Sequence, residues 1–474
     1  MKKAFSVSSV GVFFLVLFLN SLNTYSNAAS APDNPLKIGL TGKYPPFNYF
    51  NKEGELTGFD VDIAKKLCKK IDRKCEFVTL QWDGILASLL AGKIDLIIGS
   101  MAITPDREKQ ALFSTPYYES GAQIFAKNAE QDIWVPGFQI GVTLGTTYEA
   151  AIREKLPNAE IRTYKGDTEI LQDIQAERLD AIVTDRLVGG YMIRNFGVDL
   201  SPIGEPLFLE KIGIPARPNE KILIGKINTA LTSLRTSPIY DELVEKYFGL
   251  KNQTASNTFK WSTAVILLMK GLLWTTIISA CGLCLGVVFA IFLAVMMIAA
   301  PSIFRISAKF FTDFFRSTPF LIQLLGIYFG LPAVGITIQP FQAAVITMAL
   351  HSAAYLGEVL VSGFHAIPKE QRLASQLLGL SHWQAIRHII FPQMLPIVTA
   401  PSLNTVVAMI KDSAIVSVIS VYELTMQAQQ LISSTYRPFE FYLLTAILYA
   451  AITYPLILQG RKLESRIQNR GAQL

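Results

Sequence analysis

One group of residues in the first half of the chain has the chemistry needed to hold a small zwitterion. Arg107 carries a planar guanidinium that can hold a carboxylate through two hydrogen bonds. Asp185 ends an apolar run and supplies a carboxylate that can pair with an ammonium group. Ser100 and the pair Thr146–Thr147 add hydroxyl and backbone donors. Because a buried zwitterion must have both charges paired, these residue types predict a closed cleft for a molecule with a carboxylate and an ammonium.

Residues 36–250 must position these groups, and their pattern is typical of an α/β protein. Short apolar runs, which read as strands, alternate here with amphipathic patterns, which read as helices. The runs cover 36–40, 94–98, 139–142 and 181–183, and the helical patterns cover 59–69, 82–90 and 168–175. This alternation predicts βαβ units and mostly parallel sheets.

Seven short motifs in this segment, in one order, resemble those of periplasmic amino-acid-binding proteins. They are Tyr44-Pro45-Pro46-Phe47, Gly58-Phe59-Asp60-Val61-Asp62, Trp82-Asp83-Gly84-Ile85, Gly92-Lys93-Ile94-Asp95, Ile103-Thr104-Pro105-Asp106-Arg107, Phe113-Ser114-Thr115-Pro116-Tyr117-Tyr118 and Gly145-Thr146-Thr147. The resemblance implies a type II binding-protein domain over 30–250, with two lobes that close over the ligand about a hinge. The first lobe would cover about 36–121 and 217–250, and the second about 122–216.

The resemblance also assigns roles within the cleft. Arg107, Ser100, Thr146, Thr147 and Asp185 match the family's set for the ligand backbone, and Tyr44 and Trp82 match the aromatic walls that sandwich the side chain. Three structural alternatives stay open: Arg107 as a surface arginine, Trp82 as a core residue, and Asp185 as a helix N-cap. The ligand would be a polar amino acid, with arginine-like and glutamine-like ligands equally favoured. Lys43 and Glu119 would alter the pocket charge in opposite directions.

The four cysteines form two pairs along the sequence. Cys68 and Cys75 match a disulfide of the histidine- and arginine-binding members, whereas Cys281 and Cys284 lie in an apolar run and are expected to pack there. The start of the chain, Met1-Lys2-Lys3 followed by an apolar core, predicts a signal peptide over 1–29, with a retained membrane anchor as the alternative. A signal of this kind directs residues 30–250 to an oxidising, extracytoplasmic space.

The second part of the chain, 261–474, follows a polar linker at 251–260 and is predicted to be an all-α membrane domain. Residues 271–304 and 317–357 contain no charged side chain. Since about 20 apolar residues span a bilayer, we predict five transmembrane helices, at roughly 270–298, 309–331, 339–363, 391–410 and 439–459. Charged residues make a spanning helix less favourable at 411–438.

The distribution of positive charge agrees with an external binding domain. Five crossings would place 299–309, 364–390 and the C-terminus inside the cell. These segments carry Arg305, Lys309, Lys369, Arg372, Arg387, Arg461, Lys462, Arg466 and Arg470, while the outer loop 332–338 carries no positive residue. The positive-inside rule therefore predicts a multi-pass protein of the bacterial cytoplasmic (inner) membrane, with its binding domain in the periplasm or extracellular space.

The segment 364–390 resembles the cytoplasmic coupling loop of type I ABC-importer permeases. The matching residues are Ala374, Ser375, Gly379, Ile389 and Pro392, although Leu373 stands where the family has a glutamate. Phe314–Gln323, Lys411-Asp412-Ser413 and Glu423-Leu424 resemble further permease motifs. The resemblance implies that this loop docks on an ATP-hydrolysing subunit.

The chain lacks the Gly-x4-Gly-Lys-Ser/Thr phosphate loop, so ATP and Mg²⁺ are expected on a separate ATPase dimer. One permease type with a complete coupling loop favours a homodimer. We therefore predict a fused receptor and permease of an amino-acid importer that is not itself an enzyme and binds no metal or cofactor. The alternatives are a sensory membrane receptor, which would have one helix before a signalling domain, and a ligand-gated channel, which would need a filter sequence.

Overall fold

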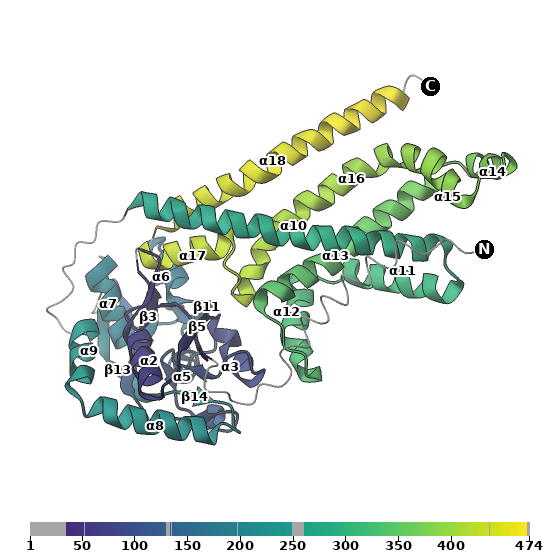
Figure 1. The fold of residues 1–474 in the computed structure, drawn as a ribbon. Helices are drawn as coiled ribbons and strands as arrows, with labels where there is room; N and C mark the ends of the chain where they lie inside the picture. The colour runs from purple at the N-terminus through teal and green to yellow at the C-terminus, as the bar shows by residue number, and fades with distance from the viewer. Residues whose placement is uncertain are drawn as a thin grey trace.

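The computed structural model describes residues 35–471 except 52, 129–132, 134, 197, 249–259 and 436 (Figure 1). The predicted signal peptide and nearly all of the predicted linker lie outside the described residues. The described chain forms an α/β part, residues 35–248, and a helical part, residues 260–471.

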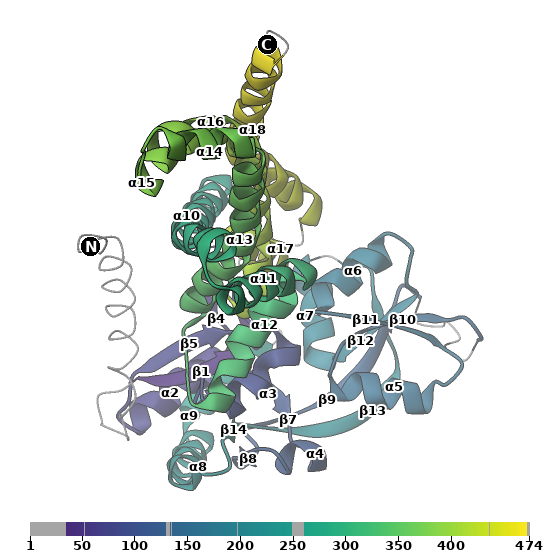
Figure 2. The same ribbon diagram turned by 90° about the vertical axis from the view of Figure 1, so that its right-hand side faces the viewer.

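The α/β part contains two sheets, each with helices packed on it (Figure 2). The first sheet has the strand order β5-β1-β6-β14-β8. Its strands are β1 (Leu36–Leu40), β5 (Cys75–Thr79), β6 (Leu96–Ile97), β8 (Leu112–Phe113) and β14 (Pro215–Ala216). The helices are α2 (Phe59–Lys70), α3 (Trp82–Leu90), α4 (Pro105–Glu108), α8 (Lys221–Arg235) and α9 (Pro238–Phe248). We call this unit lobe 1.

The second sheet has the order β11-β10-β12-β9-β13-β7 and forms lobe 2. Its strands are β7 (Met101–Ala102), β9 (Tyr118–Ala126), β10 (Gln139–Thr143), β11 (Glu160–Tyr164), β12 (Ala181–Asp185) and β13 (Ser201–Gly213). The helices are α5 (Thr147–Lys155), α6 (Asp167–Gln175) and α7 (Arg186–Phe196). The long strands β9 and β13 run between the lobes (Figure 2). A small sheet of β2 (Lys43–Tyr44), β3 (Asn48–Phe50) and β4 (Leu56–Thr57) completes lobe 1.

The predicted strands and helices of this part are confirmed, but the expectation of mostly parallel sheets is wrong. Pairing is parallel only around β1 and β10. The strands β9, β13 and β14 pair antiparallel with their neighbours because the chain crosses between the lobes and returns there. Pro215–Ala216 therefore belongs to the first sheet, two residues before the lobe boundary predicted from the sequence.

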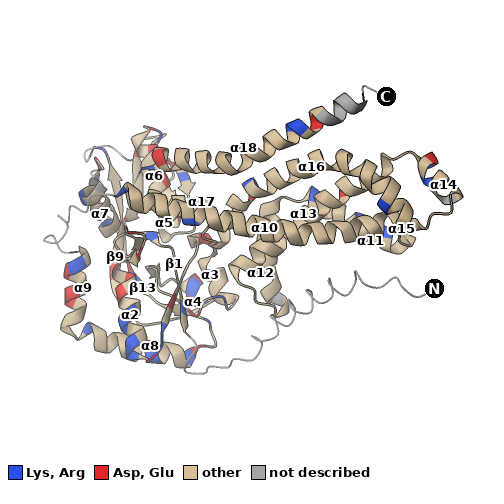
Figure 3. Cartoon of the chain, turned by 45° about the horizontal axis from the view of Figure 1, so that its top comes forward, with Lys and Arg blue, Asp and Glu red and all other residues tan. Residues whose placement is uncertain are grey.

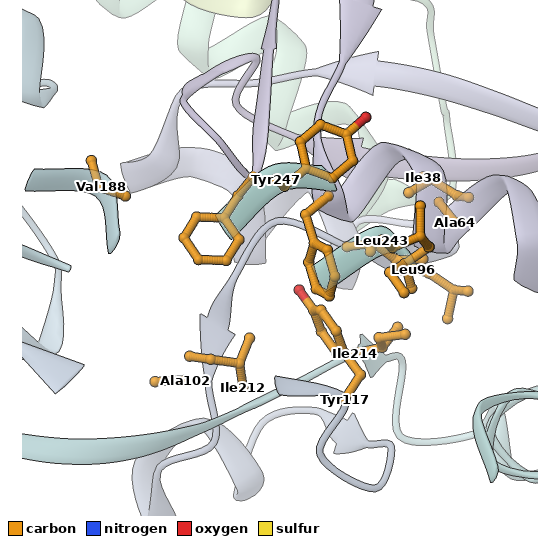
Figure 4. Close-up of a cluster of buried hydrophobic side chains, with 14 of the residues drawn as sticks. Ile38, Ala64, Leu96, Ala102, Tyr117, Val188, Ile212, Ile214, Leu243 and Tyr247 are labelled. Carbon is orange, nitrogen blue, oxygen red and sulfur yellow. The ribbon is translucent and has the colours of Figure 1, made fainter. Parts of the chain in front are cut away.

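A cluster of buried hydrophobic side chains, several of them aromatic, includes residues of α2 and α9 (Figure 4). Phe47, Phe59 and Tyr117 are fully buried in it. The ring centroids of Phe59 and Phe248 are 4.9 Å apart, and those of Phe59 and Tyr117 are 6.4 Å apart. The predicted disulfide is confirmed: Cys68 of α2 and Cys75 of β5 are bonded, and their Cα atoms are 5.9 Å apart.

The helical part contains four helices long and apolar enough to cross a membrane, counted over the described residues. These spans are Trp261–Ala299, Pro340–His365, His382–Ile419 and Pro438–Ser465. The helices are α10 (Trp261–Ala299), α11 (Ser302–Ser317), α12 (Phe320–Gly330), α13 (Pro340–His365), α14 (Lys369–Leu377), α15 (His382–Ala385), α16 (Phe391–Asp412), α17 (Leu424–Thr435) and α18 (Pro438–Gly471). A short 3₁₀ turn, η1 (Leu331–Val334), follows α12, the π-turn η2 (Ile386–Ile390) joins α15 to α16, and the 3₁₀ segment η3 (Ser413–Ile419) follows α16.

The predicted span 309–331 is divided between α11 and α12, so the described residues contain four long spans and, in α12, one shorter apolar helix. Pro319 has no backbone N–H and disfavours a helical residue before it, which ends α11 at Ser317. The side-chain amide of Gln323 donates to the carbonyls of Phe315 (2.7 Å) and Thr318 (3.0 Å), which the break leaves without helical partners. The chain thus returns toward lobe 1 through two helices instead of one (Figure 1).

The α/β part lies at one end of the helical bundle, and α14 and α15 lie at the other (Figure 1). Lys and Arg residues, coloured blue on the cartoon, lie at this far end on α11, α14, η2 and the end of α18 (Figure 3). This separation agrees with the orientation expected from the positive-inside rule.

Candidate functional site

A cleft lies between the lobes. It is lined by Thr41, Lys43, Tyr44, Leu80, Gln81, Trp82, Gly99, Ser100, Ala102 and Arg107 on one side. The residues Thr143, Thr146, Thr147, Tyr148, Lys165, Gly166, Asp167 and Glu210 line the rest. Six of the seven ligand-binding residues predicted from the sequence are among them, and Asp185 is not.

Arg107 is held in the cleft by contacts with both lobes. Thr104 caps α4 by accepting a hydrogen bond from the Arg107 backbone N–H at 3.3 Å, and Pro105 opens the helix. The guanidinium donates from Nη1 to the Ala102 carbonyl (3.0 Å) and from Nη2 to the Gly145 carbonyl (3.3 Å). Burial lowers the pKa of Arg107, and the nearby Glu210 carboxylate opposes this shift. Arginine stays charged under these conditions, so the cleft keeps a fixed positive group.

Trp82 forms the wall beside Arg107 at the start of α3. Its indole Nε1–H donates to the Gly145 carbonyl at 3.3 Å. Trp82 and Arg107 of lobe 1 therefore donate to the same backbone carbonyl of lobe 2. The Arg107 guanidinium carbon lies 5.6 Å from the centre of the Trp82 ring. Trp82 also packs partly against the neighbouring core, so it serves as a cleft wall and as a packing residue at once.

Thr146 and Thr147, at the N-terminus of α5, line the same cleft. Thr146 is the N-cap and accepts from the Glu149 N–H at 3.4 Å, while its own hydroxyl donates to the Thr143 carbonyl at 2.7 Å. Gly145 precedes it with φ +74°, a left-handed conformation that favours glycine. Helix N-termini attract anions through their free N–H groups and the helix dipole. Arg107 and this terminus together form a carboxylate-binding arrangement.

The predicted Ser100 lies in the cleft, but its hydroxyl is engaged elsewhere. It donates to Asp60 Oδ2 at 3.0 Å, and Asn48 Nδ2 donates to the same oxygen at 2.8 Å. Tyr117 donates to Asp60 Oδ1 at 2.7 Å. Burial raises the pKa of Asp60 to about 6, and these three donors oppose the shift. Ser100 therefore ties the cleft wall to the core instead of offering a free hydroxyl.

Asp185 is only 2% exposed and caps α7, as the structural alternative proposed. Its Oδ1 accepts from the Leu187 N–H at 2.8 Å. Burial raises the pKa of Asp185 to about 7. Burial is the main cause of the raised pKa values of Tyr44 and Tyr148, and the Asp185 charge raises both further. The hydroxyls of these tyrosines are 3.5 Å apart.

Two acids line the cleft that sequence reasoning did not select. Glu210 Oε2 accepts from the Thr147 hydroxyl at 2.7 Å, and burial raises the Glu210 pKa. Asp167 accepts from the hydroxyls of Thr143 and Thr184, each at 2.6 Å. Burial is also the main cause of its raised pKa. No local motif distinguishes either acid, because each reaches the cleft only through strand pairing and lobe packing.

Two lysines, Lys43 and Lys165, line the cleft together with Asp167. Lys43 was noted in the sequence for its charge alone, and Lys165 was missed. Burial lowers the pKa of Lys43; the charge of Glu169 opposes this shift and that of Lys165 adds to it. The lining of the cleft thus contains basic and acidic residues besides Arg107 and Glu210.

The predicted coupling residues form a helix–turn–helix at the far end of the bundle. Gly379, at φ +72°, ends α14, with hydrogen bonds of 3.1 Å from Leu378 N to Ala374 O and from Leu380 N to Ser375 O. Ile389 lies in η2 and Pro392 in the first turn of α16. The exposed apolar side chains of this turn are Leu373, Leu377, Leu378 and Trp383.

The two-lobed cleft and the helical bundle define the class of this protein: an amino-acid-binding domain joined to a transport permease. Residues 36–250 match the bacterial extracellular solute-binding proteins of family 3. Residues 286–469 match the inner membrane component of binding-protein-dependent transport systems.

Relatives of the first half support this assignment. The L-cystine-binding protein TcyJ of Escherichia coli (strain K12) is 34% identical over 219 residues, 45% of this chain and 82% of that protein. The ABC transporter arginine-binding protein 1 of the same strain is 31% identical over 233 residues, 48% of this chain and 96% of that protein. The histidine-binding periplasmic protein of that strain is 34% identical over 251 residues, 49% of this chain and 96% of that protein.

The chain belongs to the family 3 solute-binding proteins, and in it this domain is fused to an ABC permease of the inner membrane. It is a multi-pass membrane protein with an extracytoplasmic binding domain, and its permease family implies an ABC ATPase partner.

Proposed function

We propose that this chain is the receptor and permease subunit of an ATP-driven importer for a polar amino acid. The observation that carries the proposal is the cleft itself. A fixed guanidinium and a helix N-terminus face buried acids inside a chain that also contains the permease. This is the charge arrangement that a free amino acid needs when it is buried away from water.

The ligand carboxylate binds between Arg107 and the N-terminus of α5, where the charge and the backbone donors converge. The ammonium pairs with an acid, and two candidates compete for it. Asp185 is the residue that the family resemblance selects, and it sits behind Tyr44 and Tyr148. Glu210 lines the cleft, and its charge acts on the guanidinium. We assign the ammonium to Asp185, with Glu210 as the alternative.

The side chain of the ligand faces the end of the cleft that contains Lys43, Lys165 and Asp167. Charges of both signs there favour a ligand side chain that can both donate and accept hydrogen bonds. An amide does so, and so does a second pair of α-amino and α-carboxylate groups. A purely cationic side chain would meet two lysines. Of the two ligands that the sequence left equal, the glutamine-like one therefore fits better. A double-headed ligand fits as well, and one relative is named for cystine.

The transport part follows from the coupling helices. The exposed apolar side chains around Gly379 form the surface on which the ATPase docks, and that partner binds ATP and Mg²⁺. Two copies of this chain form the translocation path as a homodimer, each with a receptor of its own. Residues 1–29 act as the signal peptide and 251–260 as the linker between the two functional units.

The proposal is tested with the purified full chain by calorimetric titration against the common amino acids, cystine, a sugar and a dipeptide. We expect one or a few polar amino acids to bind, and Arg107→Ala to abolish this binding. The matched control is Arg162→Ala, because Arg162 lies on lobe 2 away from the cleft and bonds the Arg178 carbonyl. Binding of the sugar or the dipeptide alone would overturn the substrate class.

A further inference from the structure

Lobe 1 rests on the permease part of its own chain at separate places. In the last turn of α12, the Tyr328 carbonyl accepts a hydrogen bond from Lys93, whose ammonium lies 5.1 Å from the centre of the Phe329 ring. At the start of α10, the Leu267 side chain packs against the position of Gly54. The third contact is made by α17, which lies against β2 and β3 (Figure 1).

The α17 contact is the one that reaches the ligand cleft. The hydroxyls of Thr79 and Tyr422 are 2.5 Å apart, and the rings of Phe50 and Tyr422 meet edge to face at 6.5 Å. Beside them, Lys43 Nζ donates to Gln429 Oε1 at 3.0 Å. Lys43 also lines the cleft. One ammonium is therefore shared between the ligand site and a permease helix that lies 386 residues away in the sequence.

α17 is anchored to the long helices of the bundle. The fully buried Glu423 accepts from the Met426 N–H and from the Tyr449 hydroxyl of α18, both at 2.8 Å. The Thr275 hydroxyl of α10 accepts from the Leu424 N–H at 3.1 Å. A displacement of α17 must therefore break or move contacts with α10 and α18, and these two helices extend to the far end of the bundle (Figure 1).

We propose that Lys43 is a coupling residue that reports the state of the cleft to the permease through Gln429. A ligand whose side chain accepts a hydrogen bond from the Lys43 ammonium weakens the hydrogen bond from Lys43 to Gln429. α17 is then released from lobe 1. The inference rests on the proposed function, because it requires an amino acid in the cleft. It adds a physical link by which the fused receptor signals occupancy to the permease of the same chain.

The test uses the full chain reconstituted in lipid vesicles with its ATPase subunit and the amino acid found by titration. Two substitutions act on the permease side only. Gln429→Leu removes the acceptor, and Gln429→Glu replaces it with a carboxylate that holds Lys43 more firmly. Gln427→Leu is the matched control, since Gln427 lies on the same helix but packs toward Gly271 of α10.

We expect the two variants to change the ligand dissociation constant in opposite directions. Gln429→Glu should raise it by about tenfold, the factor for one charge-assisted hydrogen bond, and Gln429→Leu should lower it because the competing bond to Lys43 is gone. Both variants should lower the stimulation of ATP hydrolysis by ligand, whereas Gln427→Leu should leave affinity and stimulation unchanged. A purely structural role for Gln429 would not separate the signs of the two affinity changes.

Each other outcome has a defined meaning. Normal stimulation and unchanged affinity in both Gln429 variants would overturn the coupling role and leave the proposed function intact. Equal loss of stimulation in Gln427→Leu would also overturn it, because the effect would then belong to α17 as a whole. A wild-type chain that binds no amino acid would instead refute the proposed function itself.

Discussion

The assignment of the ligand ammonium to Asp185 predicts a strong pH dependence of binding. Burial raises the pKa of Asp185 to about 7, so the free protein holds this carboxyl protonated in weakly acidic solution. An ammonium pairs only with the ionised form, and the proton must leave before the ligand is held. Affinity is therefore nearly complete at pH 8 and is lost as the pH falls through 7.

The magnitude follows from this pKa. The apparent dissociation constant is proportional to one plus the ratio of protonated to ionised Asp185. This sum is about 1.1 at pH 8 and about 100 at pH 5, so affinity should fall about 90-fold between them. Amino-acid ligands keep their own ionised carboxylate and ammonium across this range, so the change comes from the protein.

The assay is calorimetric titration of the full chain from pH 5 to pH 8 in buffers of different ionisation enthalpy, which also counts the released protons. Asp185→Asn should bind weakly at every pH and lose most of the slope. Glu210→Gln is the comparison, since burial raises the pKa of Glu210 as well. A flat profile in the wild type would refute the pairing with Asp185. A slope that persists in Asp185→Asn and disappears in Glu210→Gln would move the ammonium to Glu210.

Three further predictions concern the disulfide, the coupling turn and the linker. Replacing Cys68 and Cys75 together with serine should lower the free energy of unfolding of the binding domain by about 2.5 kcal/mol in denaturant titration, given the sequence separation of 7. Gly379→Ala should reduce ATP-driven uptake while ligand affinity is kept. An alanine in this left-handed backbone conformation is strained by about 1 kcal/mol, although no atom lies within 4 Å of the new methyl group. Lengthening the linker by about 40 Gly and Ser residues should slow uptake at saturating ligand, since the effective concentration of the receptor over the permease falls.

These predictions have their own controls and contrary results. Free thiols at Cys68 and Cys75 in exported protein would contradict the disulfide and the extracytoplasmic location. Gly204→Ala places the same strain in lobe 2, at φ +60° with open space, and should not affect uptake. Equal loss in both glycine variants would show that strain alone lowers transport. An unchanged maximal rate with the long linker would mean that the fusion only keeps the receptor near the permease.

Local rules in the sequence were sufficient for several parts of this protein. The order Thr104-Pro105-Asp106-Arg107 contains an N-cap and a proline at the first helical position, and the structure presents Arg107 at the start of a capped helix. The long apolar runs likewise predicted four of the spans, because hydropathy depends on composition and length. The division of the remaining span at Pro319 was missed because the apolar run continues on both sides of the break.

Only the tertiary structure decided which charged residues line the cleft and which part of the permease contacts them. Glu210 enters the cleft because the register of β13 with β9 turns it there, and Lys165 and Asp167 do so because lobe 2 packs toward lobe 1. No spacing rule connects Lys43 with Gln429, since their contact depends on how a sheet docks on a distant helix. The sequence by itself determined the kinds of domain, their order and six of the residues that line the cleft, because these follow from short-range patterns. The side-chain end of the site and its link to the permease depend on contacts between segments far apart in the chain, and folding alone brings these together.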